Sequence, residues 1–378
     1  MSDALYDISI IGGGLAGLSL AIQCADNGYK TILFEKETYP YHKVCGEYIS
    51  NESHPFLQSL GFSFDNYQLP AINQLLLSDG KGNEFHFALP LGGFGISRYT
   101  LDNDLYQLAL NKGVTVLMDT KVNDVQFEND LFYVHAANNR IQSKVAAGCF
   151  GKKSNLDVQW KRPFATQKPN ASDHYIGVKY HIRLPHPPNE IALHNFQDGY
   201  CGMSKIEEDK SCLCYLTTAG NLRKSGNSIK EMEQTILCKN PKIKAIFNSA
   251  HFLYKDPLVI SQINFSKKNQ VENHALMLGD AAGLISPLCG NGMSMALHSS
   301  KIAFHQIQQF LQGTISRVQM EDNYTSFWKK EFSKRLWVGR NVQSLFGKNS
   351  TSAIFLKAMN RLPWMANKLI EATHGKRF

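Results

Sequence analysis

The feature that most constrains this chain is a glycine cluster between an apolar run and a helical pattern near the N-terminus. Residues 7–11 (DISII) predict a short buried strand, and Gly12-Gly13-Gly14-Leu15-Ala16-Gly17 follows it directly. Residues 15–26 then have the periodicity of a helix that ends at Asn27-Gly28. We therefore expect a strand, a glycine turn and a helix whose first amides face a phosphate group.

The residues of this turn and the acid that follows it predict a dinucleotide site. Gly12 permits the tight turn, Gly14 lets the backbone approach a pyrophosphate, and Gly17 lets the helix pack on the strand, while Leu15 and Ala16 begin the helix. A second predicted strand at 30–34 ends at Glu35, 18 residues beyond Gly17. Glu35, with Lys36 beside it, is expected to bind the ribose, and its charge argues against a 2′-phosphate and so against NADP.

A second glycine motif lies late in the chain and distinguishes FAD from NAD. Residues 275–278 (ALML) predict a strand that runs into GDAAG at 279–283, and a long helical stretch follows. This motif resembles the flavin end of the FAD-dependent monooxygenase superfamily, in which the Asp binds the ribityl chain. A carboxylate can accept ribityl hydroxyls, and a helix N-terminus stabilises negative charge on a reduced flavin. The cofactor-binding residues that this resemblance implies are Gly279, Asp280, Pro287, Gly290, Gly292 and Met293.

Two further segments resemble elements of the same superfamily. Arg98 to Leu105 matches its R-x-x-L-D-x-x-L segment, in which Arg98 is expected to reach FAD and Asp102 to support the start of a helix. The superfamily's G-A-D-G-x-x-S segment is altered, because Phe150 stands in place of the Asp. That Asp is tied to FAD and NAD(P)H binding, so the usual handling of NAD(P)H is in doubt. Reducing equivalents are expected from transient NAD(P)H docking or from a separate flavin reductase.

The loop at 39–47 carries the candidate catalytic residues. Its KVCGE string resembles the loop near the flavin in geranylgeranyl reductases and flavin-dependent halogenases, which makes Cys45, Gly46 and Glu47 site candidates. In the alternative interpretation the loop only packs against the cofactor. The W-x-W-x-I-P string of many halogenases is absent from this sequence.

The middle of the chain predicts a second, antiparallel sheet that roofs the isoalloxazine ring. Residues 70–97 and 172–265 contain short alternating runs such as 175–182 and 212–216. We interpret Cys212 and Cys214 as neighbours on one strand and expect no metal site. Ordinary sheet residues are expected at His181, His186, His194 and Tyr200.

These patterns predict an α/β fold with three parts. The first is a Rossmann-like FAD-binding domain of the glutathione-reductase type, formed by residues 1–70, 98–160 and 270–320. The second is an antiparallel β-sheet substrate domain, formed by 71–97 and 161–269, and the third is a C-terminal helical segment at 321–378.

The positive charge of the chain is concentrated near its C-terminus. Residues 329–378 contain eleven Lys or Arg and two acids, whereas the rest is close to neutral. A solvated helical face is the simplest interpretation. The alternatives are an anionic membrane surface, an acidic carrier protein or an anionic substrate, and Trp337 and Trp364 keep peripheral membrane contact among them. No recognised nucleic-acid module accompanies the charge, so nucleic acid is not an expected partner.

The sequence predicts a cytoplasmic location. The first twenty residues contain Asp3 and Asp7 and lack the basic start of an export signal. The eight cysteines include no C-x-x-C pair and are typical of reduced thiols. No apolar stretch reaches the length of a membrane-spanning helix, so any membrane contact is expected to be peripheral.

The resemblance implies an FAD-dependent oxidoreductase. Monooxygenation of a hydrophobic or aromatic small molecule, free or bound to a carrier protein, is the first hypothesis, with oxygen trapped as a flavin C4a adduct in a water-poor pocket. The alternatives are a C=C reductase similar to geranylgeranyl reductase, a flavin-dependent halogenase, and a redox-neutral isomerase similar to lycopene cyclase. A nucleotide-binding regulatory protein without catalysis fits the paired motifs less well.

Overall fold

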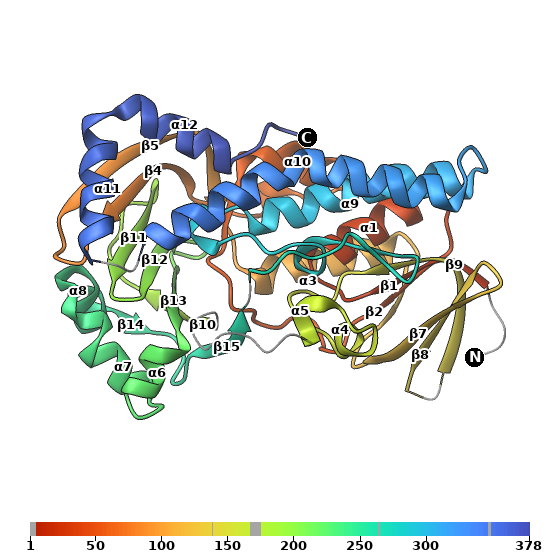
Figure 1. The fold of residues 1–378 in the computed structure, drawn as a ribbon, viewed down its shortest axis with the longest axis horizontal. Helices are drawn as coiled ribbons and strands as arrows, with labels where there is room; N and C mark the ends of the chain where they lie inside the picture. Colours follow the sequence, from red (N-terminus) through yellow and green to blue (C-terminus); the bar gives the residue numbers. More distant parts are fainter. Residues whose placement is uncertain (1–4, 138, 167–174, 264, 347–348) are drawn as a thin grey trace.

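Two β-sheets lie side by side in the computed structural model, and long helices run across both (Figure 1). The structure describes residues 5–137, 139–166, 175–263, 265–346 and 349–378. The fold is α/β, with a Rossmann-like domain on the first sheet, a second sheet domain and C-terminal helices. The predicted fold class is therefore confirmed.

The first sheet is built around the N-terminal strand. Its order is β16-β17-β9-β1-β2-β6, and β7 and β8 extend it from β9. The neighbours β17, β9, β1, β2 and β6 are parallel, so their carboxyl ends meet at one edge. The strands are β1 (Leu5–Ile11), β2 (Thr31–Phe34), β6 (Thr115–Leu117), β7 (Val122–Glu128), β8 (Leu131–Ala136), β9 (Asn139–Gly148), β16 (Val271–Glu272) and β17 (Ala275–Met277).

The second sheet has the order β14-β10-β13-β12-β11-β4-β5-β3, with β15 paired to β10. It is antiparallel as predicted, apart from the parallel pair β4 and β11. Strand β3 joins it from the N-terminal part of the chain, which the sequence did not predict. The strands are β3 (Tyr48–Ser50), β4 (Ala71–Ser78), β5 (Glu84–Gly95), β10 (Tyr175–Arg183), β11 (Glu190–Phe196), β12 (Gly199–Lys205), β13 (Ser211–Thr218), β14 (His251–Phe252) and β15 (Leu258–Ile263). Positions 172–174 and 264 of the predicted sheet region lie outside the described residues.

Helices of the first domain bring the two glycine motifs together. Helix α1 (Leu15–Asp26) has the predicted bounds and packs along α9 (Gly292–Leu311), where the Ser19 hydroxyl bonds to that of Ser300 at 2.7 Å. Both helices begin just after a glycine turn. The other helices of this domain and the second are α2 (His54–Ser59), α3 (Arg98–Asn111), α4 (Asn155–Gln159), α5 (Pro163–Thr166), α6 (Ala219–Lys224), α7 (Ile229–Thr235) and α8 (Pro241–Ser249).

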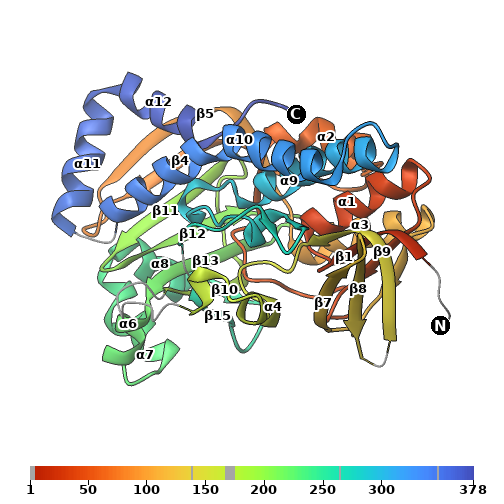
Figure 2. The same cartoon turned by 45° about the vertical axis from the view of Figure 1, so that its right-hand side comes forward.

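The C-terminal helices cover both domains. Helix α10 (Arg317–Leu345) lies along α9, and α11 (Asn349–Arg361) and α12 (Pro363–Thr373) cover the β4 and β5 part of the second sheet (Figure 2). The basic segment is thus partly structural rather than wholly a solvated face. No helix in the described ranges is both long and apolar enough to cross a membrane.

Charged and aromatic side chains of this segment divide between the core and the surface. Arg335 is 7% exposed and its Nη1 lies 3.1 Å from Oε2 of the buried Glu52. The terminal Phe378 ring stacks on the His298 ring at 4.2 Å between centroids. In contrast, Trp337 and Trp364 are 62% and 59% exposed. The Arg335–Glu52 ion pair therefore attaches the C-terminal helices to the N-terminal third of the chain.

Replacing Arg335 by Met should destabilise the fold, because it leaves the Glu52 carboxylate buried without its cation. Burial raises the pKa of Glu52 even with Arg335 present. We expect a loss of about 3 kcal/mol in the free energy of unfolding, measured by urea denaturation at neutral pH. Lys334→Met is the matched control, since Lys334 is exposed. An equal loss in both variants would show that the ion pair has no special role.

Candidate functional site

A cavity of about 1070 Å³ lies at the carboxyl edge of the first sheet and continues along the second. Ligand pockets usually have volumes of about 300–1,000 Å³, so this one is large enough for a cofactor together with a substrate. Its wall includes residues of both glycine motifs and residues of β10 to β13 and β15. In open α/β sheets ligands bind beyond the carboxyl ends of the strands, which is the position of this cavity.

The first glycine turn has the geometry of a phosphate cradle. Gly12 has a φ of +106°, and a Cβ there would lie 2.4 Å from the Cys149 carbonyl oxygen. A Cβ on Gly17 would lie 2.0 Å from the Gly12 carbonyl oxygen, so both glycines are needed for packing. A Cβ on Gly14 would meet nothing nearer than Arg98 Nη2 at 3.8 Å. Gly14 therefore faces the cavity, with the first amides of α1 beside it.

The acid after β2 lies at the edge of the same cradle. Glu35 is 5% exposed, and its carboxylate accepts hydrogen bonds from the backbone amides of Gly13 at 2.8 Å and Glu37 at 3.1 Å. A carboxylate has further lone pairs that ribose hydroxyls could use. Lys36 also lines the cavity, although its side chain is mostly exposed and paired with Glu37 at 3.4 Å.

Two cations lie near Gly14, because a Cβ there would be 3.8 Å from Arg98 Nη2 and 3.9 Å from Lys43 Nζ. Arg98 donates to Asp102 through Nε and Nη2, both at 2.7 Å, and Lys43 Nζ donates to the same carboxylate at 2.9 Å. Burial alone would raise the pKa of Asp102, but these cations lower it. The cap of α3 is Ser97, whose hydroxyl accepts from the Thr100 amide at 3.1 Å, whereas Asp102 bonds to the side chain of Arg98, the first residue of the helix. Asp102 therefore holds the side chains of both cations in place beside the cavity.

The second glycine motif completes the cavity next to the first. A Cβ on Gly279 would lie 3.4 Å from the Ala16 Cβ, so the two motifs are in contact. Asp280 lines the cavity. Burial raises its pKa, although the positive charges of Lys268, Arg98 and Lys152 act to lower it. Lys268 fixes this turn by donating to the Asp280 carbonyl at 2.8 Å.

The structure brings the predicted site residues together almost completely. Every one of them lines the cavity except Gly17, which packs behind it. Phe150 also lines the wall, beside the Gly12 turn. The members of the predicted set that line the cavity are Gly12, Gly14, Leu15, Ala16, Glu35, Lys36, Cys45, Gly46, Glu47, Arg98, Gly279, Asp280, Pro287, Gly290, Gly292 and Met293.

The side chain of Glu47 is the centre of a buried polar network. Glu47 is 0% exposed and has a φ of +56°. Its carboxylate accepts from the Arg98 amide at 2.8 Å, from Lys179 Nζ, and pairs with His181 Nε2 at 2.6 Å. Burial alone would raise the pKa of Glu47, but Lys179 and His181 hold it at about 2. The carboxylate therefore stays ionised inside the protein.

Lys179 and His181 are the functional candidates that sequence reasoning missed. Both lie on β10, two residues apart and so on one face of the strand, and each is 1% exposed. Two basic residues at this spacing in a buried strand are unusual, since such side chains need an acidic partner. That spacing was the available signal, but the sequence did not identify Glu47 as the partner.

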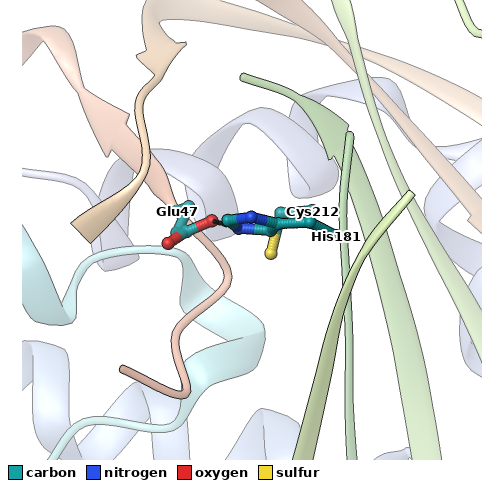
Figure 3. A group of neighbouring side chains, drawn as sticks. All are labelled: Glu47, His181 and Cys212. Carbon is teal, nitrogen blue, oxygen red and sulfur yellow. Dashed lines mark hydrogen bonds and ion pairs between the residues drawn. The ribbon is translucent and has the colours of Figure 1, made fainter. Parts of the chain in front are cut away.

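Glu47, His181 and Cys212 also lie close enough to suggest a metal site (Figure 3). One ligand atom of each lies within 4.8 Å of the others. However, Lys179 places its ammonium on the same carboxylate, and Cys212 donates its Sγ hydrogen to the Cys45 carbonyl at 3.2 Å. Burial raises the pKa of the Cys212 thiol, which opposes the thiolate that a metal needs. These contacts favour a hydrogen-bonded network over a metal centre.

The other candidate residues of the second sheet are its cysteines, His186, His194 and Tyr200. All eight cysteines are free. His194 pairs with the Ser78 hydroxyl at 2.9 Å, and burial lowers its pKa to about 4. His186 pairs with the Glu190 carbonyl at 3.0 Å. Tyr200, in contrast, lines the cavity.

Comparison with known proteins agrees with this geometry. A family model described as FAD binding domain matches residues 5–327. The chain belongs to this family. It is thus a flavoprotein of the FAD-dependent monooxygenase superfamily and binds FAD, as the paired motifs predicted.

Individual relatives are distant in sequence. Conditioned medium factor receptor 1 of Dictyostelium discoideum is 22% identical over 410 residues, spanning 100% of this chain and 75% of that protein. The 1H-pyrrole-2-carbonyl-(peptidyl-carrier protein) brominase of Pseudoalteromonas luteoviolacea is 23% identical over 323 residues, covering 82% of this chain and 78% of that enzyme. The structure of the flavin-dependent brominase Bmp2 has a TM-score of 0.81 at 18% identity and covers 98% and 93% of the two chains. Other similar folds are those of halogenases, monooxygenases and a geranylgeranyl reductase-like protein.

The cavity residues fit FAD by their shape and chemistry. The glycine cradle leaves room at Gly14, two cations face it, and a carboxylate stands at each end, at Glu35 and Asp280. This donor set matches a molecule with a diphosphate in the middle and hydroxyl groups on both sides of it.

Replacing Gly14 by Val should weaken FAD binding strongly without unfolding the protein. The new side chain would fill the space of the diphosphate, while its Cβ has no close contact and the backbone φ is −83°. We expect the Kd for FAD to rise on the order of a hundredfold, or about 2.8 kcal/mol. Flavin content and thermal unfolding of the cofactor-free protein measure the two effects. In Gly17→Ala the fold itself should be weakened, because the Cβ would clash with Gly12; equal unfolding temperatures for the two variants would contradict this distinction.

Replacing Glu47 by Gln should destabilise the protein strongly at neutral pH. The change leaves the Lys179 ammonium buried without a counter-ion, at a cost of about 3–5 kcal/mol in the free energy of unfolding. The stabilisation from an acid with a lowered pKa is present above its unfolded pKa and lost as the pH falls through the folded one. Urea denaturation should therefore show the gap between wild type and E47Q narrowing from about pH 4.5 towards about 2.

Glu233→Gln provides the matched control for this experiment. Glu233 is also buried, but its Oε1 accepts from uncharged donors, the hydroxyls of Tyr180 at 2.8 Å and Tyr215 at 2.7 Å. A glutamine oxygen can accept both hydrogen bonds, so the loss should be small. Similar losses for E47Q and E233Q would contradict the importance of the Lys179 pair.

Proposed function

We propose that this flavoprotein is a monooxygenase that hydroxylates a hydrophobic or aromatic small molecule. The observation that carries the proposal is the continuation of the cavity from the FAD cradle into an apolar compartment on the second sheet. Its wall includes Leu193, Leu216 and Ile263, together with Gly177 and Gly202. Such a lining suits an apolar substrate and excludes water.

The residues of this chain would hold and enclose the reactants. Bound FAD supplies the oxygen chemistry in this superfamily. The cations Arg98 and Lys43 would hold the diphosphate, Asp280 the ribityl chain, and the Lys43–Glu47 segment would form the wall between cofactor and substrate. The apolar compartment would keep the reactive oxygen species in contact with substrate rather than water.

Halogenation is the second candidate, and the brominase relatives support it. The P. luteoviolacea enzyme is named for a substrate carried on a peptidyl-carrier protein. A carrier-bound substrate therefore also fits the proposal for this chain. C=C reduction is kept open by the KVCGE loop, whose residues 43–47 line the cavity. We infer that electrons come from a separate flavin reductase or from transient NAD(P)H docking.

A single probe that can undergo all three reactions tests the proposal. We suggest an alkenyl-substituted hydroxybenzoic acid, supplied free and as its pantetheine thioester, with photoreduced holo-protein, bromide and ¹⁸O-labelled oxygen. Mass spectrometry should find one labelled oxygen atom in the product. Without oxygen, the flavin should stay reduced in the presence of the probe.

The other outcomes contradict the proposal in distinguishable ways. Bromine in the product would assign the protein to the halogenases. Two added hydrogens together with anaerobic flavin reoxidation would assign it to the reductases. A product with the mass of the probe but a new structure would indicate an isomerase.

A further inference from the structure

The second sheet places one tyrosine hydroxyl in the apolar compartment without a protein partner. Tyr200 lies on β12, paired with Asn195 of β11 on one side and Leu216 of β13 on the other, and it lines the cavity. The residue is 4% exposed, yet its hydroxyl forms no hydrogen bond with any residue that the structure describes. The described protein does not enclose this hydroxyl completely, so a group in the cavity can reach it.

The other hydroxyl groups in the described wall of the compartment are not available to a ligand. Tyr215 also lines the cavity, but its hydroxyl donates to Glu233 at 2.7 Å. The oxygen atoms of Tyr48 and Ser204 are enclosed by the protein, although both residues contribute other atoms to the wall. Tyr200 therefore carries the hydroxyl that a molecule in this compartment would meet.

A buried tyrosine hydroxyl without a partner indicates a bound group. Buried tyrosine hydroxyls usually find a hydrogen-bond partner, because losing water without gaining one is costly. Burial raises the pKa of Tyr200 well above its ordinary value, so the hydroxyl keeps its hydrogen at physiological pH. It can therefore donate, and the molecule that binds here should present an acceptor.

The surroundings of Tyr200 favour an acceptor without charge. The titratable groups whose charges act on the Tyr200 pKa are three thiols, those of Cys201, Cys214 and Cys289. Burial raises the pKa of each thiol, so they remain neutral. The Lys179 ammonium on β10 is already paired with Glu47. An anionic acceptor at Tyr200 would thus be buried without a counter-ion, whereas a carbonyl oxygen needs none.

Tyr200 also lies next to the second glycine motif. It belongs to the same cluster of buried apolar side chains as Leu288, which stands between Pro287 and Gly290 of that motif. A molecule held by Tyr200 is therefore close to the turn that resembles the flavin end of the cofactor site. A single polar group in an apolar wall determines which way round such a molecule binds.

We propose that Tyr200 is the substrate-recognition residue of this compartment and that the substrate is an apolar or aromatic molecule with a neutral carbonyl group. The hydroxyl donates to the carbonyl oxygen, and the apolar wall contacts the hydrocarbon part. Ketones, esters, amides and thioesters belong to this class, so a thioester on a carrier protein fits it. The inference rests on the proposed function in taking the compartment as the substrate site, but it does not depend on the reaction type.

The experiment uses three probes of nearly the same shape that differ at one group. Acetophenone has a neutral carbonyl, α-methylstyrene has a CH₂ group in place of the carbonyl oxygen, and benzoate has a carboxylate. Their naphthalene analogues are tested in parallel, so that the result does not depend on one ring size. Binding to the oxidised, FAD-loaded protein is measured by calorimetry, without turnover.

Tyr200→Phe removes the hydroxyl and keeps the ring. The quantity compared is the preference for the ketone over the alkene, expressed as the ratio of their Kd values in wild type and in Y200F. This comparison cancels the difference in how the two probes leave water. We expect the preference to fall on the order of tenfold in Y200F. Benzoate should bind the wild type more weakly than acetophenone.

A spectroscopic measurement reports the hydrogen bond directly. A hydrogen bond to a carbonyl oxygen weakens the C=O bond and lowers its stretching frequency. Infrared difference spectra of acetophenone with a ¹³C-labelled carbonyl should therefore show a lower frequency in the wild type than in Y200F.

Tyr215→Phe is the matched control, because Tyr215 lines the same cavity but uses its hydroxyl on Glu233. Y215F should keep the wild-type preference for the ketone and should unfold at a lower temperature. Y200F should not unfold at a lower temperature than the wild type in the cofactor-free protein, because its hydroxyl has no partner in the described chain. The two variants thus separate recognition from a structural role.

Several results would overturn the inference. They are an equal preference in wild type and Y200F, an equal carbonyl frequency in both, an equal fall of the preference in Y215F, and tighter binding of benzoate than of acetophenone. Failure of every probe to bind would contradict the apolar compartment itself.

The mass of the product from the alkenyl probe tests the reaction type separately. A brominated product together with the expected loss of preference in Y200F would reject the monooxygenase and keep the role of Tyr200. Labelled oxygen in the product together with an unchanged preference would do the reverse.

Discussion

The ion pair between Lys179 and Glu47 is the contact on which the site geometry depends. Glu47 lies at the end of the loop between the two sheets, and its main chain accepts from the Ile96 amide at 3.1 Å while its side chain accepts from the Arg98 amide. One residue therefore fixes the start of α3, from which Arg98 reaches towards Gly14. Because Lys179 belongs to β10, the second sheet holds the cofactor residues of the first domain in place.

This arrangement explains why ionised groups are buried here. A buried ion pair is often no more stabilising than apolar residues of the same size, because both charges lose their hydration. Its benefit is geometric, since the carboxylate accepts only where donors stand in the right directions. In this protein the donors come from Lys179, His181 and the Arg98 amide, three points that no apolar contact would align so closely. We infer that the role of the Lys179–Glu47 ion pair is to hold the loop that ends at Glu47 in position.

The sequence was sufficient where function depends on local geometry. The turn at Gly12 to Gly17 lies within one strand–helix unit, so its role and the bounds of α1 could be predicted from spacing alone. The role of Asp102 could not, because its partner Lys43 comes from another segment. The same applies to His181, which looks like an ordinary strand residue until β10 is packed against the loop that carries Glu47. Strand β3 and the attachment of Arg335 to Glu52 likewise depend on distant partners.

Two carboxylates on the cavity wall have opposite environments, and this difference separates their roles. Glu47 has its pKa lowered because Lys179 and His181 outweigh its burial, whereas burial raises the pKa of Asp280. Acids whose environments push their pKa values apart can hold different protonation states at one pH. Glu47 therefore remains an anion that is paired with the Lys179 ammonium, while Asp280 is better able to keep a hydrogen and bind hydroxyl groups. The same cavity wall thus has one acid that fixes the position of the loop and another that is suited to binding hydroxyl groups.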